Sequence, residues 1–173
     1  MAFSLYDATV PCYQQILGSV AGLLDKARAH CADKALAPDA LIQARLAEDM
    51  FPFAYQVKSA AVHSIGAIEG VRKGVFSPDR GEPPADFDGL AARVAQAREA
   101  LAGVTRAEVD AFVGRDMRFE MGSYRVDFTA EGFLMSFSLP NFFFHATTAY
   151  DILRWQGVQI GKVDFLGRMQ VKG

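Results

Sequence analysis

The chain has 173 residues, of which 51% are apolar and 22% charged, and its formal net charge is -2. A chain of this length builds one hydrophobic core, so we expect a single domain over residues 1–173. Nucleic acid is not an expected partner, because phosphate binding requires an excess of basic residues. No apolar run approaches the ~20 residues that cross a bilayer, and no signal segment is recognisable, so we expect a cytoplasmic protein without a membrane partner.

A long helix is predicted near the beginning of the chain, over residues 8–31. Its evidence is a stripe of apolar residues at spacings of three and four: Tyr13, Ile16, Leu17, Val20, Leu23, Leu24 and Ala27. Pro11 is tolerated only if it lies in the first turn. Cys12 and Cys31 would lie ~28 Å apart along this helix, so we expect both thiols to be free.

A second long helix is predicted over residues 38–71. Its apolar positions are Leu41, Leu46, Met50, Phe53, Val57, Ala60, Ala61, Ile65, Ile68 and Val71. Pro52 lies inside this pattern and should kink the helix near residues 48–52, because proline has no N–H and clashes with the preceding turn. Residues 74–88 are rich in proline and have no periodicity, which indicates a long surface connection.

Two shorter features follow the connection. Asp88 is a candidate cap for a helix that carries Leu90, Val94, Ala97 and Leu101, and Thr105 with Glu108 forms a capping-box pattern before a helical turn. Residues 118–128 alternate apolar and polar side chains on either side of Met121 and Gly122. This alternation predicts a small β-hairpin that packs against the helices.

The last long helix is predicted over residues 129–157, with Thr129 as its cap and a kink at Pro140. Its segment LPNFFFH contains three consecutive phenylalanines, which indicates a central helix enclosed on most sides. In the tail, Val163, Phe165 and Leu166 should fold back on the helices, whereas Lys162 and Arg168 should be solvated. The fold class is therefore all-α, with four long helices in a bundle and a small hairpin before the last helix.

Candidate polar residues come from the second and fourth helices. Asn141 and His145 are four residues apart and share a face of the most apolar segment. Asp49, Gln56 and His63 are spaced by seven, so they also share a face. If the two helices run antiparallel, residue 145 lies nearest residue 56, and a buried polar cluster forms between them.

Three interpretations of this cluster remain open. It is a structural hydrogen-bond network, with His145 bonded to Asp49 or Gln56, because buried polar groups need partners. It is a site for zinc or nickel, with His145, Asn141, Asp49 and His63 as the candidate ligands. In the third interpretation, Asp49, Gln56, Asn141 and His145 orient a small ligand in a metal-free pocket among the phenylalanines.

Three segments carry a family resemblance: SLYDATVP, RLAEDMFPFAYQV and LPNFFFHATTAYDILRWQGVQIGKVDFLG. They resemble a bacterial and fungal family of unknown function that is similar to the DinB-like four-helix proteins. The resemblance implies an up-down-down-up bundle with a long crossover after the second helix. Metal-binding DinB-like proteins place one histidine on the second helix and an HxxxH pair on the last. Only His145 matches that pattern directly, because Asn141 stands where the first histidine of the pair would be. The ligand of the second helix has no single match among Asp49, Gln56 and His63.

Two functions follow from the sequence and the resemblance. The first is a non-catalytic DinB-like protein that binds a small ligand or a metal in the bundle, with no certain cofactor. The alternative is a metal-dependent thiol transferase or hydrolase with a degenerate metal site, since several DinB-like proteins have these activities. We also expect a homodimer formed through exposed apolar helix faces.

Overall fold

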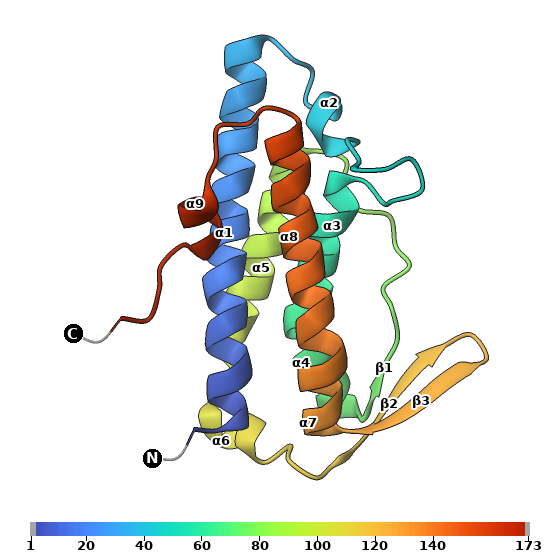
Figure 1. Cartoon of the computed structure of the whole chain (residues 1–173). Coiled ribbons are helices and arrows are strands. Elements are labelled where there is room, and N and C mark those ends of the chain that lie inside the picture. The colour runs from blue at the N-terminus through green and yellow to red at the C-terminus, as the bar shows by residue number, and fades with distance from the viewer. Residues whose placement is uncertain (1–2, 172–173) are drawn as a thin grey trace.

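The computed structural model describes residues 3–171, which are mostly helical with a small three-stranded sheet (Figure 1). The first helix, α1 (Leu5–Lys34), is six residues longer than the predicted 8–31 because it begins and ends three residues further out. At its start, the Asp7 carboxylate accepts a hydrogen bond from the backbone N–H of Ser4 at 3.1 Å. Pro11 lies in the second turn, so the expectation of a first-turn proline was wrong. Cys12 and Cys31 are free thiols on this helix, as predicted.

The prediction of a single kinked helix over residues 38–71 was wrong. Instead, α2 (Asp39–Ile42) forms one turn, and an irregular segment runs to Pro52. The helix α3 (Phe53–Ala61) begins directly after Pro52, whose backbone is extended, with φ -72° and ψ 170°. Pro52 starts the helix instead of kinking it, because a residue without an N–H costs nothing where the N–H groups of a helix are unpaired anyway.

The same helical rod continues beyond Ala61 with a change of winding. The π-helix η1 (Val62–Gly66) follows α3 and leads into α4 (Ala67–Lys73). A short strand, β1 (Val75–Phe76), comes next, and residues 77–86 then cross beside the helices to the next helix (Figure 1). The long surface connection predicted from residues 74–88 is therefore present, with β1 inside it.

The crossover is fixed by a buried lysine of α3. Lys58 is only 3% exposed, and its Nζ donates a hydrogen bond to the carbonyl of Asp79 at 2.9 Å and contacts the carbonyl of Gly81. Nζ also lies 3.3 Å from the Asp79 carboxylate, which in turn lies 3.3 Å from Arg93. One buried cation thus ties residues 79–81 to the helical core.

The crossover ends at α5 (Phe87–Ala102). Asp86 caps this helix, since its Oδ1 accepts a hydrogen bond from the backbone N–H of Gly89 at 2.7 Å, and Asp88 does not have the predicted capping role. The cap predicted at Thr105 is confirmed: its side chain accepts from the N–H of Glu108 at 3.3 Å and begins α6 (Arg106–Asp110).

The predicted hairpin is confirmed and acquires a third strand. β2 (Asp116–Met121) and β3 (Tyr124–Thr129) are antiparallel, and Gly122 in the turn has φ +62°, which suits glycine. β1 pairs in parallel with β2, with Val75 opposite Arg118. This third strand was not predicted, because two residues are too few to show an alternating pattern.

The last helical region has three parts. Thr129 caps α7 (Ala130–Gly132), the π-helix η2 (Phe133–Ser138) follows, and α8 (Leu139–Trp155) completes the region. Pro140 therefore lies in the first turn of α8, after a π-helix rather than at a simple kink. Phe142 is buried but Phe144 is 56% exposed, so the prediction that this helix is enclosed on most sides was wrong.

The helices pack in neighbouring pairs around one core. α1 packs against α5 and α8, and α3 packs against the same two helices from the other side. The short α9 (Lys162–Leu166) lies along α1 (Figure 1), where the ring of Phe165 meets that of Tyr150 at 5.8 Å. Phe165 folds back as predicted, whereas Val163 is 80% exposed. Among residues 3–171, no helix combines the length and apolar character that crossing a membrane requires.

Candidate functional site

The candidate site is centred on His145 of α8, which faces Gln56 of α3. The His145 Nδ1 lies 2.7 Å from the Gln56 Oε1, and the Gln56 Nε2 donates to the carbonyl of Phe51 at 2.8 Å. A carbonyl can only accept, so the amide nitrogen must face Phe51 and the amide oxygen must face His145. His145 therefore donates its Nδ1 proton and keeps a lone pair on Nε2. The predicted hydrogen bond between His145 and a residue of the second helical region is confirmed, with Gln56 as the partner.

His63 of η1 lies against His145. The two imidazole rings are nearly parallel, with an angle of 18° between their planes and 5.6 Å between their centroids. The Nδ1 of His63 is buried without a hydrogen-bond partner among residues 3–171. Burial lowers the pKa of His145 to about 4, and burial together with the neighbouring His145 lowers the pKa of His63 to about 4. Both rings are therefore neutral at pH 7.

The two π-helices are joined at this point. Ser138, at the end of η2, donates a hydrogen bond from its Oγ to the backbone carbonyl of His63 at 2.7 Å, and it lies 3.5 Å from the buried hydroxyl of Tyr13. Burial raises the pKa of that hydroxyl, so Tyr13 stays neutral. π-Helical turns release backbone carbonyls from the regular ladder and are frequent at functional sites. Here the contact fixes the backbone of His63 against α8.

Aromatic side chains surround the two histidines. Tyr55 and Phe144 meet His145 with centroid distances of 6.1 and 5.3 Å, and Phe51 stacks on Tyr55 at 4.0 Å. Since Phe51 and Phe144 are more than half exposed, this edge of the site faces solvent. On the inner side, His63 packs against Phe76 and Phe137. The site is thus a pair of neutral imidazoles with an apolar rim.

Two predicted members of the site make other contacts. Asp49 is exposed in the irregular segment before Pro52, so it does not share a helix face with Gln56 and His63. The side-chain nitrogen of Asn141 donates to the carbonyl of Phe137 at 2.6 Å, one turn back in its own helical region. Neither makes a described hydrogen bond to His145. Of the predicted set, His145 contacts both Gln56 and His63. Asn141 lies one helical turn from His145 without a described hydrogen bond to it.

A tightly bound zinc or nickel ion needs more ligands than this arrangement supplies. Structural zinc sites have four ligands and catalytic sites have three, drawn from histidine, cysteine and carboxylates. Nowhere in the described part of the chain do three or more such side chains come close enough together to hold a metal. The histidine pair offers two imidazoles, and the neighbouring amide of Gln56 is already used in two hydrogen bonds. These donors do not fit a firmly held ion.

Several residues of the site were not predicted from the sequence. Tyr55, Phe51 and Phe76 were not singled out because an aromatic residue in a helical or proline-rich pattern is usually part of a core. Ser138 gives no signal either, since its role depends on a carbonyl that only a π-helix exposes. The segment MFPFAYQ does contain Phe51, Tyr55 and Gln56 together, so its aromatic content was a usable hint.

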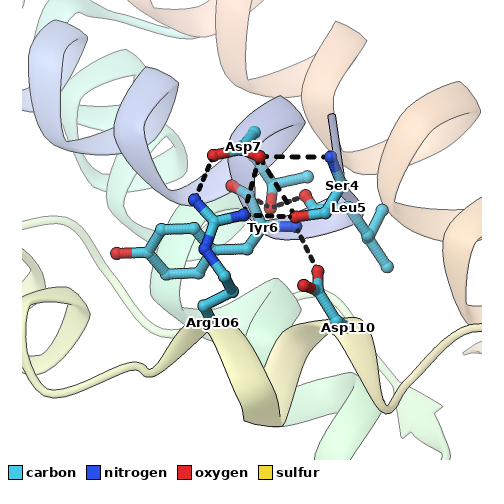
Figure 2. Close-up of polar contacts among 7 residues, drawn as sticks. Ser4, Leu5, Tyr6, Asp7, Arg106 and Asp110 are labelled. Carbon is cyan, nitrogen blue, oxygen red and sulfur yellow. Dashed lines mark hydrogen bonds and ion pairs between the residues drawn. The ribbon is translucent and has the colours of Figure 1, made fainter. Parts of the chain in front are cut away.

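A second polar cluster involves the segment SLYDATVP at the start of α1. Arg106 of α6 donates from Nη1 to both Ser4 Oγ and Asp7 Oδ2 at 2.7 Å, and its Nη2 bonds the other oxygen of Asp7 (Figure 2). The guanidinium also lies over the ring of Tyr6, and the backbone N–H of Tyr6 donates to Asp110 at 3.0 Å. The Arg106 hydrogen bond lowers the pKa of Asp7 to about 2. This cluster locks α6 onto the start of α1.

The helical fold is that of the DinB-like class of proteins. A crystal structure of a DinB family member from Shewanella denitrificans is similar to this chain, with 30% sequence identity and a TM-score of 0.80. The match covers 98% of this chain and 95% of the other. The chain belongs to the family described as Domain of unknown function (DUF1993), whose sequence profile matches residues 5–166. A search of curated proteins finds no match.

Proposed function

We propose that this protein is a non-catalytic DinB-like protein that binds a small molecule at the His63–His145 pair. The observation that carries the proposal is the fixed orientation of His145. Its Nδ1 is held by Gln56, which leaves the Nε2 lone pair available beside a solvent-facing aromatic rim. An imidazole acceptor that is not bonded to a protein group and lies at a solvent-facing edge can accept a hydrogen bond from a ligand.

We also propose that the helices form the up-down-down-up bundle of DinB-like proteins. The pairing of α1 with α5 and α8, and of α3 with α5 and α8, supports this arrangement. So does the course of the chain in Figure 1, where residues 77–86 return along the helices before α5 begins. In such a bundle the histidine pair lies between the α3 and α8 rods.

The chemistry of the site favours a ligand with a hydrogen-bond donor on an apolar or aromatic body. A neutral imidazole with a free Nε2 accepts a hydrogen bond but does not attract an anion, because both pKa values near 4 leave the pair uncharged at pH 7. The rings of Tyr55 and Phe144 offer edges and faces to an aromatic ligand. Phe76, which packs on His63, also lines a cavity of about 400 Å³ between η1, α4 and α5.

Phenol and anisole test this ligand class as a matched pair, since they differ by the hydroxyl proton. A ligand with so few heavy atoms should bind in roughly the millimolar range. The imidazole nitrogen resonances of His145 in ¹⁵N NMR spectra report on binding at the site. We expect phenol to shift these resonances and anisole to leave them unchanged. Gln56→Met should weaken phenol binding because it releases the His145 ring, whereas Gln43→Met, at an exposed glutamine, should not. Equal shifts with both compounds, or none with either, would exclude the proposed ligand class.

The metal-dependent thiol transferase or hydrolase remains the alternative function. One feature favours it, because an imidazole oriented through Nδ1 is the usual state of a metal-binding histidine. Tag-free protein should be mixed with equimolar zinc or nickel, dialysed and analysed for metal. We expect no stoichiometric ion and almost no change in melting temperature, since a tight site would raise the melting temperature by mass action. One retained ion per chain, lost in His145→Ala, would show a metal site and favour the alternative over a metal-free ligand site.

Homodimer formation and a cytoplasmic location are further parts of the proposal. Trp155, at the end of α8, is 75% exposed, which supports self-association through this end of the helix. The two free thiols support a reducing compartment. Light scattering should give twice the chain mass of 18.9 kDa, and Trp155→Gln should shift the particles toward the mass of one chain. A single-chain mass for the wild type at micromolar concentration would rule the dimer out.

A further inference from the structure

A second cavity lies far from the histidine pair in the fold, between α1, α5 and the chain that follows α8. We call it the α1–α9 groove. Its volume is about 760 Å³, within the range of small-molecule sites, and its lining includes Gly18 and Gly22 of α1, Arg98 of α5, and Val163 and Arg168. None of its lining residues belongs to the histidine site.

The outer wall of the groove is held firmly against α1. The Nε2 of Gln15 donates to the carbonyl of Leu166 at 2.8 Å, and Lys26 forms an ion pair with Asp164 at 2.6 Å. Gly167 has φ +58°, and a Cβ there would lie only 2.4 Å from the Oγ of Ser19, so the chain passes directly over α1 at this point. The wall is therefore a fixed part of the structure.

The groove is cationic although the whole chain has a net charge of -2. Three cations, Lys26, Arg98 and Arg168, line it, together with the single carboxylate of Asp164. Asp164 neutralises Lys26, whereas Arg98 and Arg168 make no ion pair within the described chain. The guanidinium of Arg98 lies over Gly18, 3.8 Å from where a Cβ would be. Two guanidinium groups thus border one concave surface without a protein counter-charge.

The glycine at the floor of the groove has no structural reason to be a glycine. Gly22 lies within α1, and a Cβ built on it would have no heavy atom within 4 Å. Glycine inside a helix costs about 1 kcal/mol relative to alanine. Neither a positive φ nor a close protein neighbour explains this cost. An open floor lets a ligand approach the helix backbone, which is one established use of glycine.

We propose that the α1–α9 groove binds a small organic anion with an apolar body, with Arg98 and Arg168 as the groups that recognise its charge. Guanidinium groups bind carboxylate, sulfonate and phosphate oxygens through charge-assisted hydrogen bonds. The apolar body lies on the glycine floor, beside Pro11 and Val163. A concave site walled on two sides suits a small molecule better than the flat face of a second chain.

The test uses two fluorescent probes that share the same aromatic body. Anilinonaphthalene sulfonate carries the anion, and phenylnaphthylamine lacks it. We expect the full-length protein to bind the sulfonate, and Arg98→Gln combined with Arg168→Gln to weaken this binding by about tenfold or more. Phenylnaphthylamine binding should be unchanged in that variant. Lys34→Gln combined with Arg80→Gln removes the same charge elsewhere and should have little effect.

A second pair of variants separates blocking from unfolding. Gly22→Ala and Gly22→Leu should both stabilise α1, because both residues favour a helix more than glycine does. Only the leucine side chain fills the groove, so Gly22→Leu should lose sulfonate binding while its melting temperature rises, and Gly22→Ala should retain it. The proposal is overturned if the sulfonate does not bind, if both probes bind equally, or if Gly22→Leu binds normally. It is also overturned if Gly22→Leu instead converts a dimer to single chains, because the groove would then be a subunit interface.

Discussion

The His63–His145 pair should make the protein sensitive to mild acid. In the unfolded chain each histidine titrates near its ordinary pKa of 6.5, whereas in the folded protein both pKa values are lowered to about 4. As the pH falls below 6.5, the histidines bind protons in the unfolded state and stay unprotonated in the folded state. The free energy of unfolding therefore falls with pH, and the contribution of the pair is fully present only above pH 6.5.

The size of this effect follows from the two pKa values. Between pH 7 and pH 5 each histidine should lower the free energy of unfolding by about 2 kcal/mol, and the loss continues toward pH 4. This range excludes most of the carboxylate contribution, since unfolded aspartate and glutamate titrate near pH 4. Both rings stay largely neutral in the folded protein above pH 5, so their effects should add. The total is a large part of the stability of an ordinary domain.

Urea denaturation followed by circular dichroism at pH 7, 6 and 5 measures this loss. His63→Phe is the informative variant, because His63 already packs against Phe76 and Phe137 and an aromatic ring can replace it. It should lose about half of the pH dependence between pH 7 and pH 5. His30→Gln removes the third histidine, on α1, as a control. If His63→Phe keeps the full wild-type slope, or if both imidazoles titrate above pH 6 by NMR, the burial argument is refuted.

Three further predictions concern stability. Lys58→Met should cost about 2 to 3 kcal/mol by urea denaturation, because it strands the acceptors on residues 79–81, whereas Lys73→Met at an exposed site should cost little; equal losses would contradict the buried clamp. Asp7→Asn should lower the free energy of unfolding equally at pH 7 and pH 5. The pKa of Asp7 is lowered to about 2, so its stabilising contribution is present above its ordinary pKa of 3.8 and is lost as the pH falls through 2. A stability difference between wild type and variant that shrinks from pH 7 to pH 5 would count against the Arg106 ion pair. His145→Ala should cost about 1 to 3 kcal/mol by stranding Gln56, and less when combined with Gln56→Met than the two single losses added together; strict additivity would show that the two side chains are not coupled.

The sequence determined most of the helical content and one contact of the site. The stripe from Tyr13 to Ala27 is long and regular, so α1 could be predicted to within three residues at each end. The hairpin around Gly122 and the caps at Thr105 and Thr129 depend on the preferences of a few neighbouring residues, so they can be predicted from the sequence. The His145–Gln56 contact was predictable because helical spacing and an antiparallel pairing together place these two residues level.

The tertiary structure decided where the apolar pattern of residues 38–71 was helical and where it was not. Leu41, Leu46 and Met50 have helical spacing, but residues 43–52 are irregular in the structure. Apolar spacing indicates which side chains could share a buried face, and it does not by itself make the backbone helical. Asp49, which lies in this irregular segment, is therefore not on the helix face that carries Gln56 and His63. The π-helices were also invisible in the sequence, since their extra residue is stabilised by a contact between distant segments, the hydrogen bond from Ser138 to the carbonyl of His63. Local sequence sets the preferences of each segment, and only packing between segments selects the backbone geometry that brings His63 against His145.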